Sequence, residues 1–183
     1  MNNKQIDKIQ EYPLDNFDID KLLVRDPAKI TKFSNLKHIS DINDIFNENN
    51  QAILFYDLGE IGHWVGLIRK PHENTIEYMD PYGYNPSTPL QWIDENQRNK
   101  MGIHDDYLNP LLKKAKMQGT KIIISKNKFQ SLSNEDNNTC GRHVVSRMLL
   151  SELTLPEYKK VISDSKMNAD KFVTLFTHKI LGK

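Results

Sequence analysis

Four side chains with complementary chemistry follow one another along this chain: His63, Asp80, Gln130 and Cys140. Cys140 is the only cysteine among the 183 residues, and it follows an Asn-rich polar loop at the start of a helical pattern. The positive end of a helix dipole favours the thiolate form of a cysteine, which is the nucleophilic form. A thiol nucleophile also needs a base, a group that orients the base and a donor for the developing oxyanion. His63, Asp80 and Gln130 are of the right types, so Cys140 is a candidate nucleophile.

Alternative interpretations exist for several residues. A free cysteine is often an inert core residue, and a loop glutamine is often simply exposed. His143 lies three residues after Cys140, but a base on the nucleophile's own helix leaves little room for substrate, so we expect a structural or substrate-flanking role for His143. Glu77 is an alternative orienting acid, although strand alternation places it on the face opposite to the one expected for Asp80. Cys140 and His143 also have the spacing of two of the four ligands of a zinc site. The sequence contains no second cysteine and no other pair of ligands at a suitable spacing, so we expect no metal and no other cofactor.

Periodicity places the four residues at the ends of predicted elements. We expect short helical pieces within the first 50 residues, including one helix face formed by Ile39, Ile42, Ile45 and Phe46. The predicted strands cover residues 52–56, 64–68, 75–79 and 121–125, with a turn at 57–59, and the later predicted helices cover 89–96, 110–117, 140–153, 156–163 and 169–180. Helices followed by strands and then by helices indicate an α+β fold rather than an alternating α/β fold, with the first strands antiparallel.

Composition favours a single domain over residues 1–183, made of a helical part (1–50), a central part with the candidate residues (51–155) and C-terminal helices (156–183). The chain is 38% hydrophobic and has a formal net charge of +1, which gives no general attraction to nucleic acid or membranes. One cysteine excludes an intramolecular disulfide framework, and no secretory or membrane-spanning segment is visible. We therefore expect a soluble, intracellular protein.

Charge is unevenly distributed along the chain. Residues 1–60 carry a net charge of −4, whereas residues 111–147 carry +6. The lysines of this basic stretch are Lys113, Lys114, Lys116, Lys121, Lys126 and Lys128. A solvated helix face is the simpler explanation, and a weak contact with DNA is the alternative that remains open.

Four ordered blocks carry a family resemblance: residues 62–67 (GHWVGL), 78–83 (YMDPYG), 129–131 (FQS) and 139–143 (TCGRH). Together they resemble the superfamily of adenovirus-type and Ulp-type cysteine proteases, and most closely the capsid-maturation proteases of virophages and Polinton-type, mavirus-like elements. The resemblance covers about residues 50–155 well and 18–46 more loosely. It implies an adenain/Ulp-like fold, in which a central mixed or antiparallel sheet packs against helices and the nucleophile begins a helix.

The resemblance also implies roles for individual residues. Cys140 would be the nucleophile, His63 the general base, Asp80 the acid that orients His63, and Gln130 an oxyanion-hole donor. Gly141 and Trp64 are candidates for substrate binding, and each also has an ordinary packing interpretation. In the adenoviral relative, a peptide cofactor is joined through a disulfide to a second cysteine, which this chain lacks, so no disulfide-linked cofactor is expected.

The implied activity is that of an endopeptidase that cleaves capsid or other virion proteins during maturation, at small-residue sites of the Gly-Gly or Gly-Ala type. Such an enzyme would act in the host cytoplasm or virus factory and be packaged in the virion. One alternative is an isopeptidase that acts on ubiquitin or SUMO. The second alternative is a catalytically inactive relative that serves as a binding module or scaffold.

Overall fold

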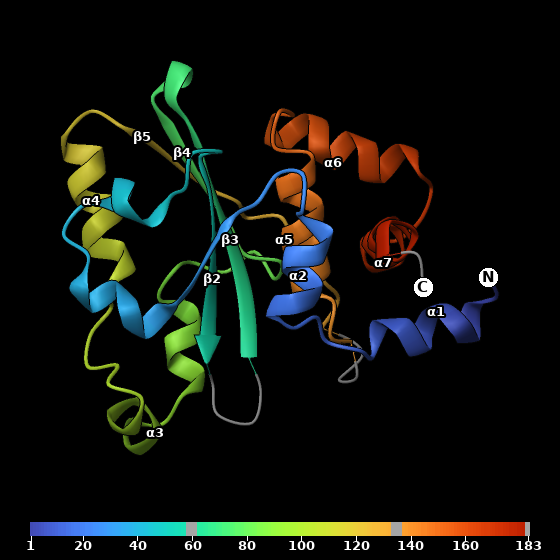
Figure 1. Cartoon of the computed structure of the whole chain (residues 1–183), viewed down its shortest axis with the longest axis horizontal. Helices are drawn as coiled ribbons and strands as arrows, with labels where there is room; N and C mark the ends of the chain where they lie inside the picture. The colour runs from blue at the N-terminus through green and yellow to red at the C-terminus, as the bar shows by residue number, and fades with distance from the viewer. Residues whose placement is uncertain (58–61, 133–136, 182–183) are drawn as a thin grey trace.

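A five-stranded mixed sheet forms the centre of the computed structural model, which describes residues 1–57, 62–132 and 137–181 (Figure 1). The strands lie in the order of the chain: β1 (Lys29–Lys32), β2 (Gln51–Asp57), β3 (Gly62–Lys70), β4 (Thr75–Met79) and β5 (Lys121–Ile124). The three central strands are antiparallel to one another, while β1 runs parallel to β2 and β5 runs parallel to β4. The outer strands therefore make the sheet mixed.

Helices cover both faces of this sheet. Figure 1 shows α3 and α4 on one side, and α2, α5, α6 and α7 on the other. The α-helices are α1 (Asn3–Gln10), α2 (Asn16–Leu22), α3 (Glu95–Lys100), α4 (Leu108–Met117), α5 (Cys140–Leu149), α6 (Leu155–Asp164) and α7 (Ala169–Leu181). The 3-10 helices are η1 (Phe33–His38), η2 (Ile42–Ile45), η3 (Pro71–Glu73) and η4 (Thr88–Trp92).

Strand alternation divides the apolar core into two clusters. Val65 and Leu67 of β3 belong to the cluster that includes α4, whereas Trp64 and Ile68 belong to the cluster that includes α5. Neighbouring residues of a strand point to opposite faces, so β3 contributes to both cores at once. The sheet is buried on both sides as a result, which explains why its central strands consist mainly of apolar residues.

The predicted class and the central strands are confirmed. The structure has the α+β order, the strands expected at 52–56, 64–68 and 75–79 lie within β2, β3 and β4, and these three are antiparallel neighbours. The strand expected at 121–125 is β5, and the helices expected at 110–117, 156–163 and 169–180 are α4, α6 and α7, with ends that differ by at most two residues. The turn expected at 57–59 lies mostly outside the described residues.

Several boundaries were wrong, and local hydrogen bonds explain two of them. No helix runs over the face expected at 39–46: η1 ends at His38, Ile39 is extended, and η2 begins at Ile42, where Asp41 accepts a hydrogen bond from the backbone N–H of Asn43 and starts a new turn. The helix expected over 89–96 is divided into η4 and α3, because Asp94 caps the second helix. The helix expected over 140–153 ends at Leu149.

The N-terminal part, residues 1–50, was expected to be helical, but it also contains the strand β1. This strand has only four residues, two of which are lysines, and its hydrogen-bonded neighbour β2 lies about twenty residues further along the chain. A short strand of this kind is stabilised by pairing with another strand rather than by its own sequence pattern.

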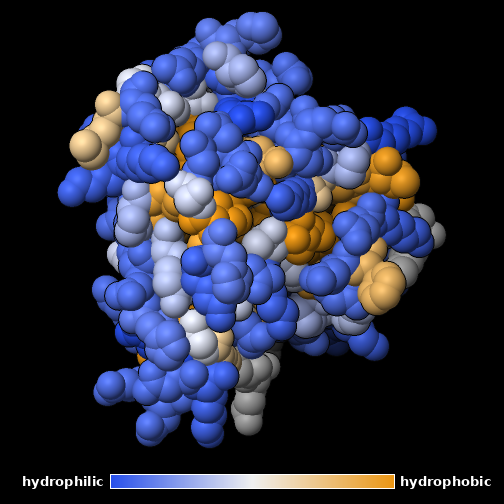
Figure 2. Space-filling view, turned by 60° about the vertical axis from the view of Figure 1, so that its left-hand side comes forward, coloured by the Kyte–Doolittle hydropathy of each residue, from blue (hydrophilic) through white to orange (hydrophobic). Residues whose placement is uncertain are grey.

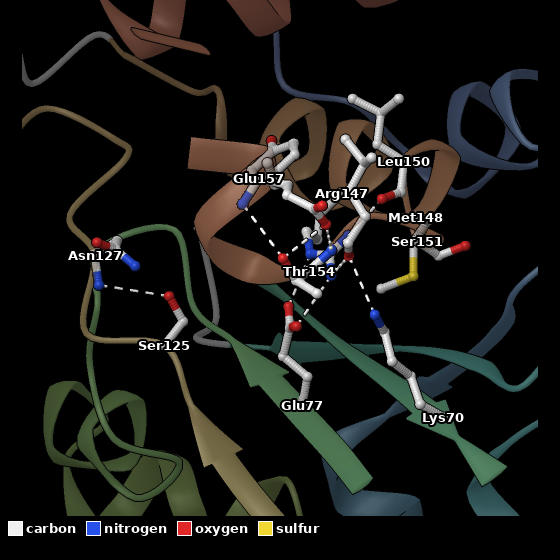
Figure 3. A network of polar contacts seen from close by, with 12 residues as sticks. Lys70, Glu77, Ser125, Asn127, Arg147, Met148, Leu150, Ser151, Thr154 and Glu157 are labelled. Carbon is white, nitrogen blue, oxygen red and sulfur yellow. Dashed lines mark hydrogen bonds and ion pairs between the residues drawn. The ribbon is translucent and has the colours of Figure 1, made fainter. Parts of the chain in front are cut away.

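Helix α5 is fixed to the sheet by a close approach and by a buried ion pair. A Cβ atom at Gly66 would lie 2.4 Å from Cε of Met148 and 3.2 Å from Cγ1 of Val144, so a larger residue here would have to displace the Met148 side chain. Arg147 donates hydrogen bonds of 2.8 and 3.0 Å to the two carboxylate oxygens of Glu77 on β4 (Figure 3). Arg147 also donates to the carbonyls of Leu150 and Leu153, so each of its three side-chain nitrogens makes at least one hydrogen bond. Glu77 thus points toward α5, away from Asp80.

Candidate active site

Cys140 is the first residue of α5, as the sequence predicts. Its side chain is only 9% exposed, and it forms part of the wall of a pocket of about 610 Å³. Because α5 is anchored to the sheet along its length, the position of the thiol is set by a rigid helix rather than by a loop. A thiol at a helix start lies beside N–H groups that have no partner within the helix.

His63 and Asp80 form a buried hydrogen-bonded pair. The register of β3 and β4 pairs Gly66 with Met79, so the chain beyond Met79 runs beside the beginning of β3. Nε2 of His63 lies 2.9 Å from Oδ2 of Asp80, and the two side chains are 3% and 0% exposed. The other carboxylate oxygen of Asp80 accepts a 2.7 Å hydrogen bond from the backbone N–H of Tyr82. Both oxygens of Asp80 are therefore held.

The second ring nitrogen of His63, Nδ1, is the one available to the thiol of Cys140. Cys140 acts on the electrostatics of His63 as Asp80 does, and since Nε2 faces Asp80, Nδ1 is the ring nitrogen left for Cys140. Burial by itself lowers the pKa of His63, but Asp80 and Cys140 outweigh that effect and raise the pKa from 6.5 to about 9. The imidazole is thus held in its protonated form at neutral pH, between a carboxylate and a thiol.

Gln130 lies on a loop that is tied to the Asp80 loop. The backbone N–H groups of Phe129 and Gln130 both donate to the carbonyl of Pro81, at 2.9 Å each. The Gln130 side chain is buried, and its Nε2 donates at 2.8 Å to the carbonyl of Asn137, three residues before Cys140. One of the two N–H groups on Nε2 is used in this bond, which leaves the other for an external acceptor.

The pocket beside Cys140 is lined mainly by apolar and aromatic side chains, among them Leu14, Phe17, Phe55 and Trp64. The indole N–H of Trp64 donates to the carbonyl of Leu14 at 3.1 Å, which ties the N-terminal segment to β3. Phe17 is 85% exposed at this site. Trp64, predicted as a substrate contact, therefore forms part of the pocket wall next to the thiol.

Gly141, the other predicted substrate contact, is buried against protein atoms. A Cβ atom there would lie 3.2 Å from Cβ of Leu14 and 3.2 Å from Cδ1 of Trp64. The close packing of Leu14 and Trp64 against this position explains why a glycine is found here. A role for Gly141 in substrate binding stays a prediction.

The sequence reasoning gave no role to two further groups near the site. Tyr82 stacks on His63 with ring centroids 5.3 Å apart, and Trp92 meets the same imidazole edge-on at 5.5 Å. Tyr82 could have been found from its place two residues after Asp80, where an Asx turn brings its N–H to the carboxylate. Trp92 comes from a separate 3-10 helix, and no local signal links it to His63.

A second histidine–aspartate pair was also missed. Nε2 of His143 lies 2.9 Å from Oδ1 of Asp170, the second residue of α7, and both side chains are buried. This contact gives His143 the structural role that was one of the two expected for it. Asp170 lies thirty residues after Cys140 in the sequence and carries no motif of its own.

The basic stretch lies on α4, on β5 and on the segment that follows. All six of its lysines are exposed, whereas Arg142 and Arg147 of the same stretch are buried. The side that carries α4 is turned forward in Figure 2, where hydrophilic side chains cover most of the surface and enclose smaller apolar areas. Lys114 and Lys126 are hydrogen-bonded to Ser40 and Asn85. A contact between these lysines and DNA stays a prediction.

The described part of the chain offers neither a cluster of metal ligands nor a membrane-spanning helix. Residues 1–57, 62–132 and 137–181 contain no group of three or more His, Cys, Asp and Glu side chains that could hold a metal ion. In the same part of the chain, no helix has the length and apolar character needed to cross a membrane.

Comparisons with known proteins complete the description of the site. No protein-family model matches the chain. The solved structure of the ASFV pS273R protease is similar with a TM-score of 0.47 and 16% sequence identity, over 90% of this chain and 67% of that one. A protein of the Sputnik virophage, described as "Uncharacterized protein V9", is 31% identical over 179 residues, which cover 95% of this chain and 99% of V9. The chain therefore belongs to the same family as the Sputnik virophage protein V9.

Proposed function

We propose that this protein is a cysteine endopeptidase with a triad of Cys140, His63 and Asp80. The observation that carries the proposal is the position of His63, whose ring is buried between the Asp80 carboxylate at 2.9 Å and the thiol at the start of α5. A nucleophile, a base in contact with it and an acid that orients the base are the requirements of covalent acyl transfer.

In the first step, the sulfur of Cys140 attacks the carbonyl carbon of a peptide bond. His63 accepts the proton of the thiol, and Asp80 stabilises the imidazolium that results. Asp80 also fixes the orientation of the ring, since its second oxygen is held by the N–H of Tyr82. The attack forms a C–S bond and places a negative charge on the former carbonyl oxygen.

That oxyanion is stabilised by N–H donors. The free N–H of the Gln130 amide and the backbone N–H of Cys140 are the donors we assign to it. His63 then gives its proton to the leaving amine as the C–N bond breaks. Water, deprotonated by His63, hydrolyses the thioester and regenerates the thiol.

The proposed substrates are capsid or other virion proteins. The family relationship to a virophage protein supports a viral context. Trp64 and the N-terminal segment, joined by a hydrogen bond, bound the pocket beside Cys140, and we propose that this wall admits a chain with small residues at the cleavage site, such as Gly-Gly or Gly-Ala. We infer action in the infected cell and packaging in the virion from the same viral context.

The direct test is to incubate the purified protein with the virion proteins encoded beside it and to map new termini by mass spectrometry. We expect a small set of new N-termini after small residues, and none with Cys140→Ala. Ser146→Ala is a matched control, because Ser146 lies on the same helix, is also buried, and among the described residues its hydroxyl is bonded to Tyr158, away from the site.

Fluorogenic Gly-Gly peptides, SUMO and ubiquitin conjugates complete the substrate panel. Cleavage of the conjugates without cleavage of any virion protein would replace the endopeptidase by an isopeptidase. If no member of the panel is cleaved, and Cys140 reacts with iodoacetamide like an ordinary thiol, the protein is an inactive relative.

A further inference from the structure

Asp170 contacts both loops that carry the proposed catalytic groups. Its Oδ1 accepts a 2.7 Å hydrogen bond from the hydroxyl of Thr139 and a 2.9 Å hydrogen bond from Nε2 of His143. Its Oδ2 accepts a 3.0 Å hydrogen bond from the backbone N–H of Ser131. Thr139 directly precedes the nucleophile, and Ser131 directly follows the proposed oxyanion donor. One carboxylate on α7 thus joins the two loops.

The bond from Thr139 is unusual for its position. Thr139 is the N-cap residue of α5, where a threonine side chain ordinarily accepts a hydrogen bond from a backbone N–H of the first turn. Thr154 does so at the start of α6, and Asp15 does so at the start of α2. The Thr139 side chain makes no such bond, because its hydroxyl is turned to Asp170.

The first turn of α5 is therefore left uncapped beside the thiol. In the part of the chain that the structure describes, the backbone N–H groups of Cys140, Gly141 and Arg142 have no hydrogen-bond acceptor. Unpaired N–H groups at a helix start are the natural ligands of an anion. At this helix start the anion is the thiolate before attack and the oxyanion after it.

Asp170 is suited to accept all of these bonds as a carboxylate. Burial raises its pKa, but the hydrogen bonds from His143, Thr139 and Ser131 outweigh burial and hold the pKa below its ordinary value. His143 in turn is enclosed by Phe129, whose ring stacks on it with centroids 6.3 Å apart. The donors come from two segments, the start of α5 with Thr139 and His143 and the loop with Ser131, so the carboxylate can satisfy all three only when both segments are in place.

We propose that Asp170 is a positioning residue, which holds the Thr139 hydroxyl away from the first turn of α5 and so keeps the N–H groups there free for the thiolate and the oxyanion. This role rests on the proposed function, because it concerns the same nucleophile. Asp170 itself does not touch the substrate.

The first test compares isosteric variants. Thr139→Val removes the hydroxyl and keeps the shape, whereas Thr139→Ser keeps the hydroxyl. The matched control is Thr174→Val on α7, since the Thr174 side chain is equally buried and, among the described residues, its hydroxyl donates to the backbone carbonyl of Asp170. We expect kcat to fall roughly tenfold in Thr139→Val with KM unchanged, because the bond that ties the residue before the nucleophile to Asp170 is lost and the nucleophile shifts slightly. Thr139→Ser should retain most of kcat, and Thr174→Val should change only the unfolding temperature.

A double variant tests the capping argument itself. Asp170→Ala frees the Thr139 hydroxyl to cap the N–H of Gly141 or Arg142, which weakens the positive field of the helix start at the thiolate and oxyanion, so kcat should fall by more than in Thr139→Val, on the order of thirtyfold. Valine cannot cap, so Asp170→Ala combined with Thr139→Val should be at least as active as Asp170→Ala alone. If the two losses simply multiply, the capping argument is wrong.

The rate at which iodoacetamide alkylates Cys140 separates the two proposals. In one outcome, the wild-type protein cleaves no substrate, but alkylation of Cys140 is slower in Thr139→Val and Asp170→Ala than in Thr174→Val. The proposed function is then wrong, and the positioning role of Asp170 is supported. In the other outcome, the wild-type protein cleaves its substrate and both Asp170→Ala and Thr139→Val keep the wild-type kcat. The positioning role of Asp170 is then overturned, and the proposed function stands.

Discussion

Two buried histidine–aspartate pairs near Cys140 have the same geometry and different surroundings. His63 with Asp80 and His143 with Asp170 both have 2.9 Å between Nε2 and a carboxylate oxygen. Three of the four side chains come from outside α5, whereas His143 shares the helix of the nucleophile. By distance and burial alone, either histidine qualifies as the base.

The difference lies in the second ring nitrogen. In His63 this nitrogen is the one available to Cys140, which helps to raise the pKa of the imidazole, and the rings of Tyr82 and Trp92 contact the imidazole. In His143 it is buried and has no partner among the described residues. A histidine–carboxylate pair is therefore not enough to define a base: the other nitrogen must face the reacting atom.

The largest expected effect compares the two histidines directly. His63→Gln should lower kcat on the order of ten-thousandfold, because the general base is lost. His143→Gln should retain far more activity and cost about 1–3 kcal/mol of unfolding free energy, because a buried hydrogen bond to a carboxylate is weakened. Steady-state kinetics and urea unfolding of both variants measure the contrast. Equal losses of kcat would erase the distinction between the pairs.

Next in size is the effect of Asp80→Asn, which should lower kcat roughly a thousandfold and change its pH dependence. In the wild-type protein we expect activity to fall as the pH rises through about 9, where His63 loses its proton. Asparagine stabilises the imidazolium less, so the fall should move to lower pH. Initial rates between about pH 5 and pH 10 test this, and an unmoved alkaline limb would assign the titration to another group.

The same shift predicts a change in stability. Because the pKa of His63 is raised on folding, protonation stabilises the folded state fully below about pH 6.5, and this contribution is lost as the pH rises through about 9. His63→Gln should lack this alkaline loss of stability, as measured by urea unfolding across that range.

A smaller effect is expected at the oxyanion loop. Gln130→Ala should lower kcat about a hundredfold with little change in KM, because the donor acts only on the developing charge. Gln51→Ala is the control, since Gln51 is equally buried but donates to Met148 and Ser151, away from the site. A loss in KM rather than in kcat would assign Gln130 to ground-state binding.

The smallest effect should come from Gly141→Ala. The added methyl group must displace Leu14 or Trp64 by a few tenths of an ångström, so we expect a cost of about 1 kcal/mol in unfolding free energy and a decrease of about threefold in kcat/KM. Parallel measurement of KM and unfolding temperature separates packing from substrate contact. An increase in KM at unchanged stability would favour the substrate role.

The sequence by itself determined the class of fold, the central antiparallel strands and the elements that carry the four candidate residues. These features depend on local periodicity and on residue types, which can be read in a short window. It also favoured His63 over His143, because a base on the nucleophile's helix leaves no place for substrate. The short strand β1 was missed because pairing, not periodicity, makes it a strand.

Only the tertiary structure decided what surrounds the candidate residues. The register of β3 and β4 brings Asp80 to His63, and the docking of α7 brings Asp170 to Thr139 across thirty residues of sequence. Such contacts join segments that are distant in sequence, and a local sequence pattern does not predict which distant segments will pack against each other. The physical reason is that the hydrogen bonds of a buried carboxylate are satisfied by whichever donors the packed elements bring within reach.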